Sequence, residues 1–96
     1  MKTLLIDDVR NLDASYTARN YQEGIKALKR ESWDHLLLDH DLASFSKSGR
    51  EYTGYDIACW LERNPQHLPK KVTIVSSNPV GVSRIKSALS RLTEVI

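Results

Sequence analysis

Acidic side chains follow two apolar runs of this sequence, each at the point where the run ends. Asp7 and Asp8 come directly after the run TLLI, and Asp39, His40 and Asp41 come directly after the run HLLL. Carboxylates held close together repel one another and need a cation or a proton to coexist. Mg²⁺ commonly binds one or two carboxylates together with phosphate and water oxygens. If folding brings the two places together, these residue types predict a phosphate site that uses Mg²⁺ or Mn²⁺.

A third polar group suits an anion rather than a cation. Ser76 and Ser77 offer hydroxyl groups, and Asn78 stands before a proline as the cap of a predicted helix. The free N–H groups and the positive end of such a helix favour a bound phosphate. Gly81 in the first turn leaves room for its approach, and Arg10 could neutralise further negative charge.

His40 is the only histidine of the chain that is flanked by acids. Two interpretations stay open. The imidazole could move a proton near neutral pH, which is the usual catalytic use of histidine. Alternatively, His40 is a capping residue that Asp8 or Asp41 holds in place.

The apolar patterns place these groups on a recognisable framework. Strands are predicted at 2–6, 34–39 and 70–77, with a weaker alternating strand at 14–20. Helices are predicted to begin after the caps Asn20, Thr53 and Asn78. Residues 43–52 are polar and contain a glycine, which predicts a loop, and 93–96 form either a last strand or a tail.

Strands that alternate with helices predict an α/β fold with a mainly parallel sheet of four to five strands and about three helices. Residues 1–96 are expected to form a single domain. The connection after the first strand is too short for a helix. In such a sheet, ligands bind beyond the carboxyl ends of the strands, where all three polar groups stand.

Composition and charge narrow the class of protein. The chain has 41% hydrophobic and 27% charged residues, a single cysteine and no apolar run near the roughly 20 residues that span a bilayer. We therefore expect a cytoplasmic protein with no membrane partner. The formal charge is +2, but eight of the twelve acids precede residue 49, so the second half is basic. That half is either a set of solvated helix faces or a basic rim that attracts a phosphate-bearing small molecule or a nucleic-acid end.

Four short motifs together resemble the cyclic-phosphate processing receiver-like family. They are DDVR at 7–10, LDHDL at 38–42, TGYD at 53–56 and SNPVG at 77–81, and their order agrees along nearly the whole chain. The resemblance implies a shortened response-regulator receiver fold, which is a three-layer, flavodoxin-like sandwich. It also implies a ligand that is a cyclic phosphate or is derived from a nucleotide.

The resemblance assigns roles to individual residues. It places in the pocket Asp7, Asp8, Arg10, Asp39, His40, Asp41, Gly54, Asp56, Ser77 and Asn78. With Ser76 and Gly81 added from the polar group before the predicted helix, the catalytic set would be Asp39, His40 and Asp41; the cation ligands would be Asp7, Asp8 and Asp39; and the ligand-binding set would be Arg10, Gly54, Asp56, Ser76, Ser77, Asn78 and Gly81. By analogy with response regulators, Asp39 is the phosphoryl-acceptor position. Family members commonly carry a histidine where this chain has Val75. A mechanism with two histidines is therefore not expected.

Three hypotheses follow for the function. The protein is a metal-dependent phosphoesterase or cyclic phosphodiesterase, or it is a binding module that holds the same ligand without turnover. The third hypothesis is a catalytically inactive receiver-like interaction protein, for example a phage-encoded inhibitor or regulator of a host protein. The intact acidic groups favour the first hypothesis, and Val75 favours the other two.

Overall fold

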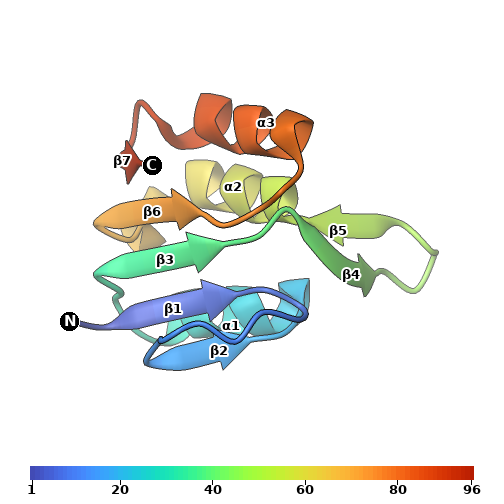
Figure 1. The fold of residues 1–96 in the computed structure, drawn as a ribbon, viewed down its shortest axis with the longest axis horizontal. Coiled ribbons are helices and arrows are strands. Elements are labelled where there is room, and N and C mark those ends of the chain that lie inside the picture. The colour runs from blue at the N-terminus through green and yellow to red at the C-terminus, as the bar shows by residue number, and fades with distance from the viewer.

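The computed structural model describes residues 1–96 as a five-stranded parallel sheet, a separate hairpin and three helices (Figure 1). The elements follow in the order β1 (Thr3–Ile6), β2 (Tyr16–Ala18), α1 (Tyr21–Arg30), β3 (His35–Leu38), β4 (Asp41–Phe45), β5 (Glu51–Thr53), α2 (Gly54–Arg63), a 3-10 turn (Pro65–His67), β6 (Lys71–Ile74), α3 (Pro79–Leu89) and β7 (Glu94–Val95). No helix is long and apolar enough to cross a membrane.

The five strands lie in the order β2-β1-β3-β6-β7, and every neighbouring pair is parallel. The central strands are in register, so that Leu4 lies beside Leu36 and Leu36 beside Val72. This arrangement confirms the predicted receiver-like α/β fold with a mainly parallel sheet and three helices. The expected three-layer sandwich is reduced to two layers, because no helix connects β1 to β2 and all three helices pack on one face. The last residues form the edge strand β7, which settles the choice between a strand and a tail.

The two faces of the sheet differ in chemistry. Leu4, Leu36 and Val72 are fully buried and belong to a core cluster that includes residues of all three helices. In Figure 1, α1 and α2 lie behind the sheet, α3 runs beside α2 at the top of the view, and the irregular segment between β1 and β2 lies in front of the sheet. On that front face, His35 and Thr73 are partly exposed and joined by a hydrogen bond of 2.7 Å. Hydrogen-bonded polar side chains let this face meet water without a layer of helices.

Local capping explains where the helices begin. The side-chain oxygens of Asn20 and Asn78 accept hydrogen bonds from the backbone N–H groups of Glu23 and Gly81, at 2.9 and 3.0 Å. Thr53 caps α2 in a complete capping box. All three predicted caps are confirmed. Each cap satisfies backbone donors that the first turn of a helix leaves free, which typically contributes about 1 kcal/mol.

The prediction of a loop at 43–52 is wrong, because these residues build the antiparallel hairpin β4–β5. Burial alternates along β4, with Leu42 and Ser44 buried and Phe45 exposed. A serine at a core-facing position hid that alternation, and its hydroxyl accepts a hydrogen bond from the N–H of Tyr21 at 2.9 Å. The pairing shifts register between Asp41 and Ser44, as in a β-bulge.

Candidate functional site

The carboxyl ends of β1 and β3 bring the two acidic groups together, as the parallel register requires. The N–H of Asp39 donates to the carbonyl of Ile6 at 3.0 Å, which fixes the end of β3 beside the end of β1. The N–H of Val75 donates to the carbonyl of Leu38 at 3.0 Å and brings the end of β6 to the same edge. The three predicted polar groups therefore share one edge of the sheet.

Three carboxylates form a cluster at this edge. One oxygen from each of Asp7, Asp8 and Asp39 lies within 4.8 Å of the others. Asp7 is completely buried and Asp39 is only 5% exposed, whereas Asp8 is half-buried. Buried carboxylates this close together are costly unless cations or hydrogen-bond donors compensate for their charge.

Asp7 has such compensation within its own loop. Its Oδ1 accepts hydrogen bonds from the backbone N–H groups of Val9 and Arg10 at 3.0 and 2.9 Å, and its Oδ2 accepts one from Arg10 Nη1 at 3.0 Å. Burial by itself would raise the pKa of Asp7. The backbone and guanidinium donors outweigh that effect and lower the pKa below its ordinary value.

Asp39 is much less well compensated. Its Oδ1 accepts a hydrogen bond from the N–H of His40 at 2.9 Å and lies 3.4 Å from Arg10 Nη1. Burial, together with the negative charge of Asp7, raises the pKa of Asp39 above its ordinary value. Of the two buried carboxylates, that of Asp39 therefore gains more from an added cation.

Arg10 bridges the two buried acids, and its pKa is raised chiefly by the hydrogen bond to Asp7. When all groups are ionised, three carboxylates and one guanidinium leave two negative charges at this edge. A divalent cation matches that charge, and carboxylate oxygens are the donors that Mg²⁺ and Mn²⁺ prefer. The residues of the cluster therefore fit either ion.

The ring of His40 is fixed by two neighbours. Its Nδ1 lies 3.0 Å from Asp41 Oδ1, and in the tautomer that donates Nδ1–H to this carboxylate the lone pair is on Nε2. A Cβ atom placed on Gly81 would lie 2.3 Å from Cγ of His40, so only glycine lets the ring pack against α3. The contact with Asp41 agrees with both interpretations of His40, the residue that moves a proton and the residue that caps the strand end.

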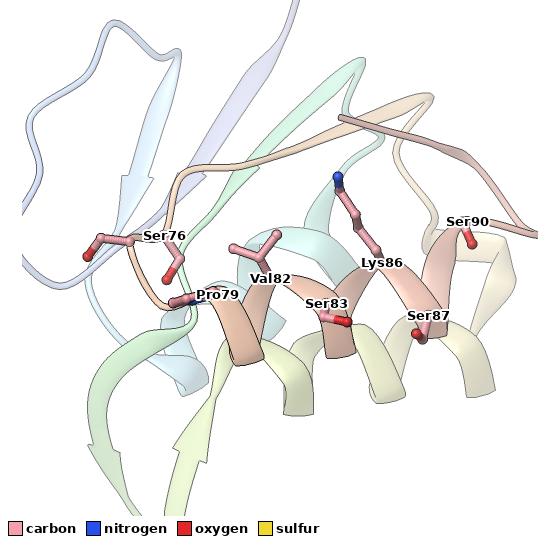
Figure 2. A pocket seen from close by; sticks show the side chains of 8 residues that line it. Ser76, Pro79, Val82, Ser83, Lys86, Ser87 and Ser90 are labelled. Atoms are coloured by element: carbon pink, nitrogen blue, oxygen red, sulfur yellow. The ribbon is translucent and has the colours of Figure 1, made fainter.

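The loop after β6 completes this edge. The hydroxyl of Ser76 accepts a hydrogen bond from the N–H of Asn78 at 3.0 Å, and Asn78 Nδ2 lies 3.5 Å from Nδ1 of His40. Ser76 and the exposed Ser77 also line a groove of about 620 Å³ that runs along α3 (Figure 2). Both serines therefore face space that a ligand could occupy.

Gly54 and Asp56 lie in the first turn of α2, next to the end of β3. The N–H of Gly54 donates to the carbonyl of His40 at 2.7 Å, and a Cβ atom on Gly54 would lie 2.1 Å from the carbonyl oxygen of Asp39. The carboxylate of Asp56 accepts hydrogen bonds from Arg50 at 2.7 Å and from the N–H of Thr53 at 2.8 Å. Gly54 therefore holds the end of β3 against α2, and Asp56 holds the first turn of α2 to Thr53 and Arg50.

Arg19 is a residue of this region that the sequence analysis did not single out. Its guanidinium donates to the carbonyls of Arg10 and Asp7 at 2.7 and 3.3 Å and to Asn11 Oδ1 at 2.6 Å. These bonds hold the segment that follows β1 and so keep Arg10 beside the acids. No local sequence signal distinguishes Arg19 from other arginines, because its partners lie eight or more residues away.

Comparison with known proteins places the chain in a family. A comparison with curated proteins finds no match. The model of the cyclic-phosphate processing receiver domain family, however, matches residues 2–91. That range contains the carboxyl ends of β1, β3 and β6 and all three helices. The chain therefore belongs to the cyclic-phosphate processing receiver domain family.

Proposed function

We propose that the protein binds a cyclic phosphate ester together with Mg²⁺ or Mn²⁺ at the carboxyl edge of the sheet and hydrolyses it. The observation that carries the proposal is the cluster of Asp7, Asp8 and Asp39, whose oxygens lie within 4.8 Å of one another. The family match supports a ligand of the cyclic-phosphate class. Asp7, Asp8 and Asp39 would hold the cation. When bound, the cation would act as a Lewis acid that polarises a phosphoryl oxygen, and it would lower the pKa of a bound water.

The residues around the cluster divide the remaining work. Hydrolysis adds water to phosphorus, breaks one of the two ring P–O bonds and leaves a monoester and a free hydroxyl group. His40 would take the proton of the attacking water on Nε2 and return it to the departing oxygen, while Asp41 holds its Nδ1–H. Arg10 lies next to Asp7 and Asp39 and would offset the charge that develops on the phosphate.

Val75 limits the mechanism to one histidine. His35 lies at the amino end of β3 and His67 lies in the 3-10 turn, so His40 is the only histidine at the carboxyl edge. A single imidazole can serve first as a base and then as an acid within one turnover. The same arrangement without this proton transfer would give a binding module for the same ligand.

The test measures binding and turnover separately. Uridine 2′,3′-cyclic monophosphate is mixed with the protein with and without Mg²⁺ or Mn²⁺, the melting temperature is recorded, and the products are followed by phosphorus NMR. We expect a metal-dependent rise in melting temperature and conversion to a monoester. Asp39→Asn should abolish both effects, and His40→Asn should abolish the conversion alone.

Asp13→Asn makes the same chemical change at an exposed position outside the site and should behave like the unmodified protein. Stabilisation without conversion would reduce the proposal to ligand binding. The absence of any metal-dependent effect, or effects that Asp39→Asn leaves unchanged, would contradict the proposal and favour the interaction protein.

A further inference from the structure

The second half of the chain carries a long segment with positive charge only. Between Glu62 and Glu94 the sequence contains no acidic residue and six cationic ones: Arg63, Lys70, Lys71, Arg84, Lys86 and Arg91. This segment supplies β6 and α3, which adjoin the candidate site. Lys70 and Lys71 stand at the amino end of β6, away from the candidate site, and Lys70 and Arg91 are paired with Asp34 and Glu62. Lys86 is therefore the cation of this segment that brings an unpaired charge to the groove beside α3, where it can attract an anionic ligand.

The groove along α3 lies within this segment. Its lining consists of Ser76, Ser77, Pro79, Val82, Ser83, Lys86, Ser87 and Ser90, with Lys86 as the only charged side chain. Figure 2 shows Lys86 one turn beyond Val82 on the same side of α3, with its ammonium group extended away from the helix. Lys86 lies within 4 Å of no carboxylate, so its charge is not neutralised within the protein.

The chemistry of the lining indicates what the groove can bind. Serine hydroxyls and lysine are common partners of nucleic-acid phosphates, and they contact the backbone without reading the bases. No aromatic side chain lines the groove, so it offers no platform on which a base could stack. The groove therefore suits the sugar–phosphate backbone of a nucleic acid better than a single nucleotide base.

The position of Lys86 distinguishes a long ligand from a short one. Lys86 follows Pro79, the first residue of α3, by seven positions, which corresponds to about 10 Å along a helix. One phosphate bound beside Asp39 and Ser76 cannot also contact Lys86. A strand with further phosphates could do so, because its backbone carries a phosphate at every nucleotide along its length.

We propose that the groove along α3 binds the backbone of a single-stranded oligonucleotide whose terminal phosphate occupies the acidic site. The placement of the terminal phosphate rests on the proposed function. The inference adds the class of substrate, which is a nucleic-acid end rather than a mononucleotide. Lys86 provides the charged contact to an internal phosphate. Ser83 and Ser87, one turn apart on α3, provide hydroxyl contacts along the same path.

Binding is measured by fluorescence anisotropy with a labelled RNA of six uridines that ends either in a 2′,3′-cyclic phosphate or in an ordinary hydroxyl. Lys86→Ala should weaken binding of both RNAs about five- to tenfold and reduce the dependence of log K on log salt by about 0.7 to 1. It should leave the affinity for uridine 2′,3′-cyclic monophosphate unchanged. The matched control is Lys29→Ala, which removes the same charge from an exposed position on α1.

The RNA with the hydroxyl end separates this inference from the proposed function. It should bind without a divalent cation, because it carries no terminal phosphate for the acidic site, so the groove is tested even if no hydrolysis occurs. Equal losses with Lys29→Ala and Lys86→Ala would overturn the inference. An RNA that binds no more tightly than the mononucleotide would also overturn it.

Discussion

The ends of β1 and β3 lie side by side and both carry a buried aspartate, yet the two are built in opposite ways. At the end of β1, the turn that follows Asp7 supplies the hydrogen-bond donors that its carboxylate needs. At the end of β3, Asp39 accepts one hydrogen bond within its own loop, and its pKa is raised. The first end is a stable turn, and the second keeps a carboxylate available to a cation.

The surroundings hold the end of β3 in place from outside. Gly54 approaches the carbonyl of Asp39, Gly81 accommodates the ring of His40, and Ala43 adopts a left-handed backbone conformation with φ of 49°. A residue other than glycine in that region costs about 1–2 kcal/mol. Strain that packing sustains is common at functional sites, where geometry matters more than local stability. If the ends of β1 and β3 differ in this way, substitutions at the end of β1 should lower the stability of the protein. Some substitutions at the end of β3 should raise it.

The largest effect is expected from Gly54→Ala. The new Cβ atom would lie 2.1 Å from the carbonyl oxygen of Asp39, a backbone atom that cannot move without shifting the end of β3. We expect a loss of about 3 kcal/mol in the free energy of unfolding, measured by urea titration. Gly24→Ala is the control, since its Cβ atom would meet the flexible end of Ile6 at 2.8 Å. A similar loss in both variants would show that the end of β3 is not specially constrained.

Asp7→Ala should cost about 2 kcal/mol, because it removes a buried acceptor of two backbone hydrogen bonds and one from Arg10. Since the pKa of Asp7 is lowered in the folded state, its contribution is present above about pH 4 and is lost as the pH falls further. Unfolding followed between pH 7 and pH 3 should therefore show the difference from the unmodified protein shrinking in acid.

Asp8→Ala is the matched control for that experiment, since Asp8 is only half-buried and makes no hydrogen bond or ion pair. Its stability should stay within about 0.5 kcal/mol of the unmodified protein. A cost at Asp8 equal to that at Asp7 would mean that the turn after β1 is stabilised by the whole acidic pair.

The sequence predicted the strands and caps of this fold because those signals are local. The runs at 2–6 and 34–39 stand out by their apolar residues, and Asn20, Thr53 and Asn78 stand out as caps. The hairpin was missed because Ser44 faces the core while Phe45 faces water, which reverses the expected pattern. In a bulged strand, tertiary contacts such as that of Ser44 with Tyr21 decide burial more than residue type.

The sequence predicted that the two acidic groups share one edge of the sheet, but not which contacts hold them there. The acids and Arg10 lie together because parallel strands end at one edge, which topology alone dictates. The sequence could not show that Arg10 already bridges Asp7 and Asp39, or that Gly81 makes room for His40. A glycine shows that something approaches closely, and only the three-dimensional structure shows what does.

Asp39→Asn should raise the melting temperature of the metal-free protein by a few degrees. Burial and the charge of Asp7 disfavour the ionised form, and an amide can still accept the hydrogen bond from His40. Because the pKa of Asp39 is raised in the folded state, the advantage should be full at neutral pH. It should disappear in acid once the carboxyl group is protonated. Thermal unfolding at pH 7 and pH 4 measures both effects.

Asp34→Asn is the contrasting variant, at the other end of β3. The pKa of Asp34 is lowered, chiefly by the hydrogen bond from the N–H of Lys2 and then by the hydrogen bond from Lys70. Its replacement should therefore lower the melting temperature at pH 7. A fall in both variants would remove the proposed difference between a satisfied and an unsatisfied aspartate.

The smallest effect is expected from Ala43→Gly. Glycine relieves the left-handed conformation at φ of 49° but adds freedom to the unfolded chain, so the net gain in stability should be about 0.5 kcal/mol. Gly49→Ala makes the reverse change at φ of 86° in the same hairpin and should lower stability. If the strain at Ala43 serves to aim Asp41 at His40, Ala43→Gly should also reduce hydrolysis of the cyclic phosphate while stability rises. A gain in stability with unchanged hydrolysis would show that the strain contributes nothing to the site.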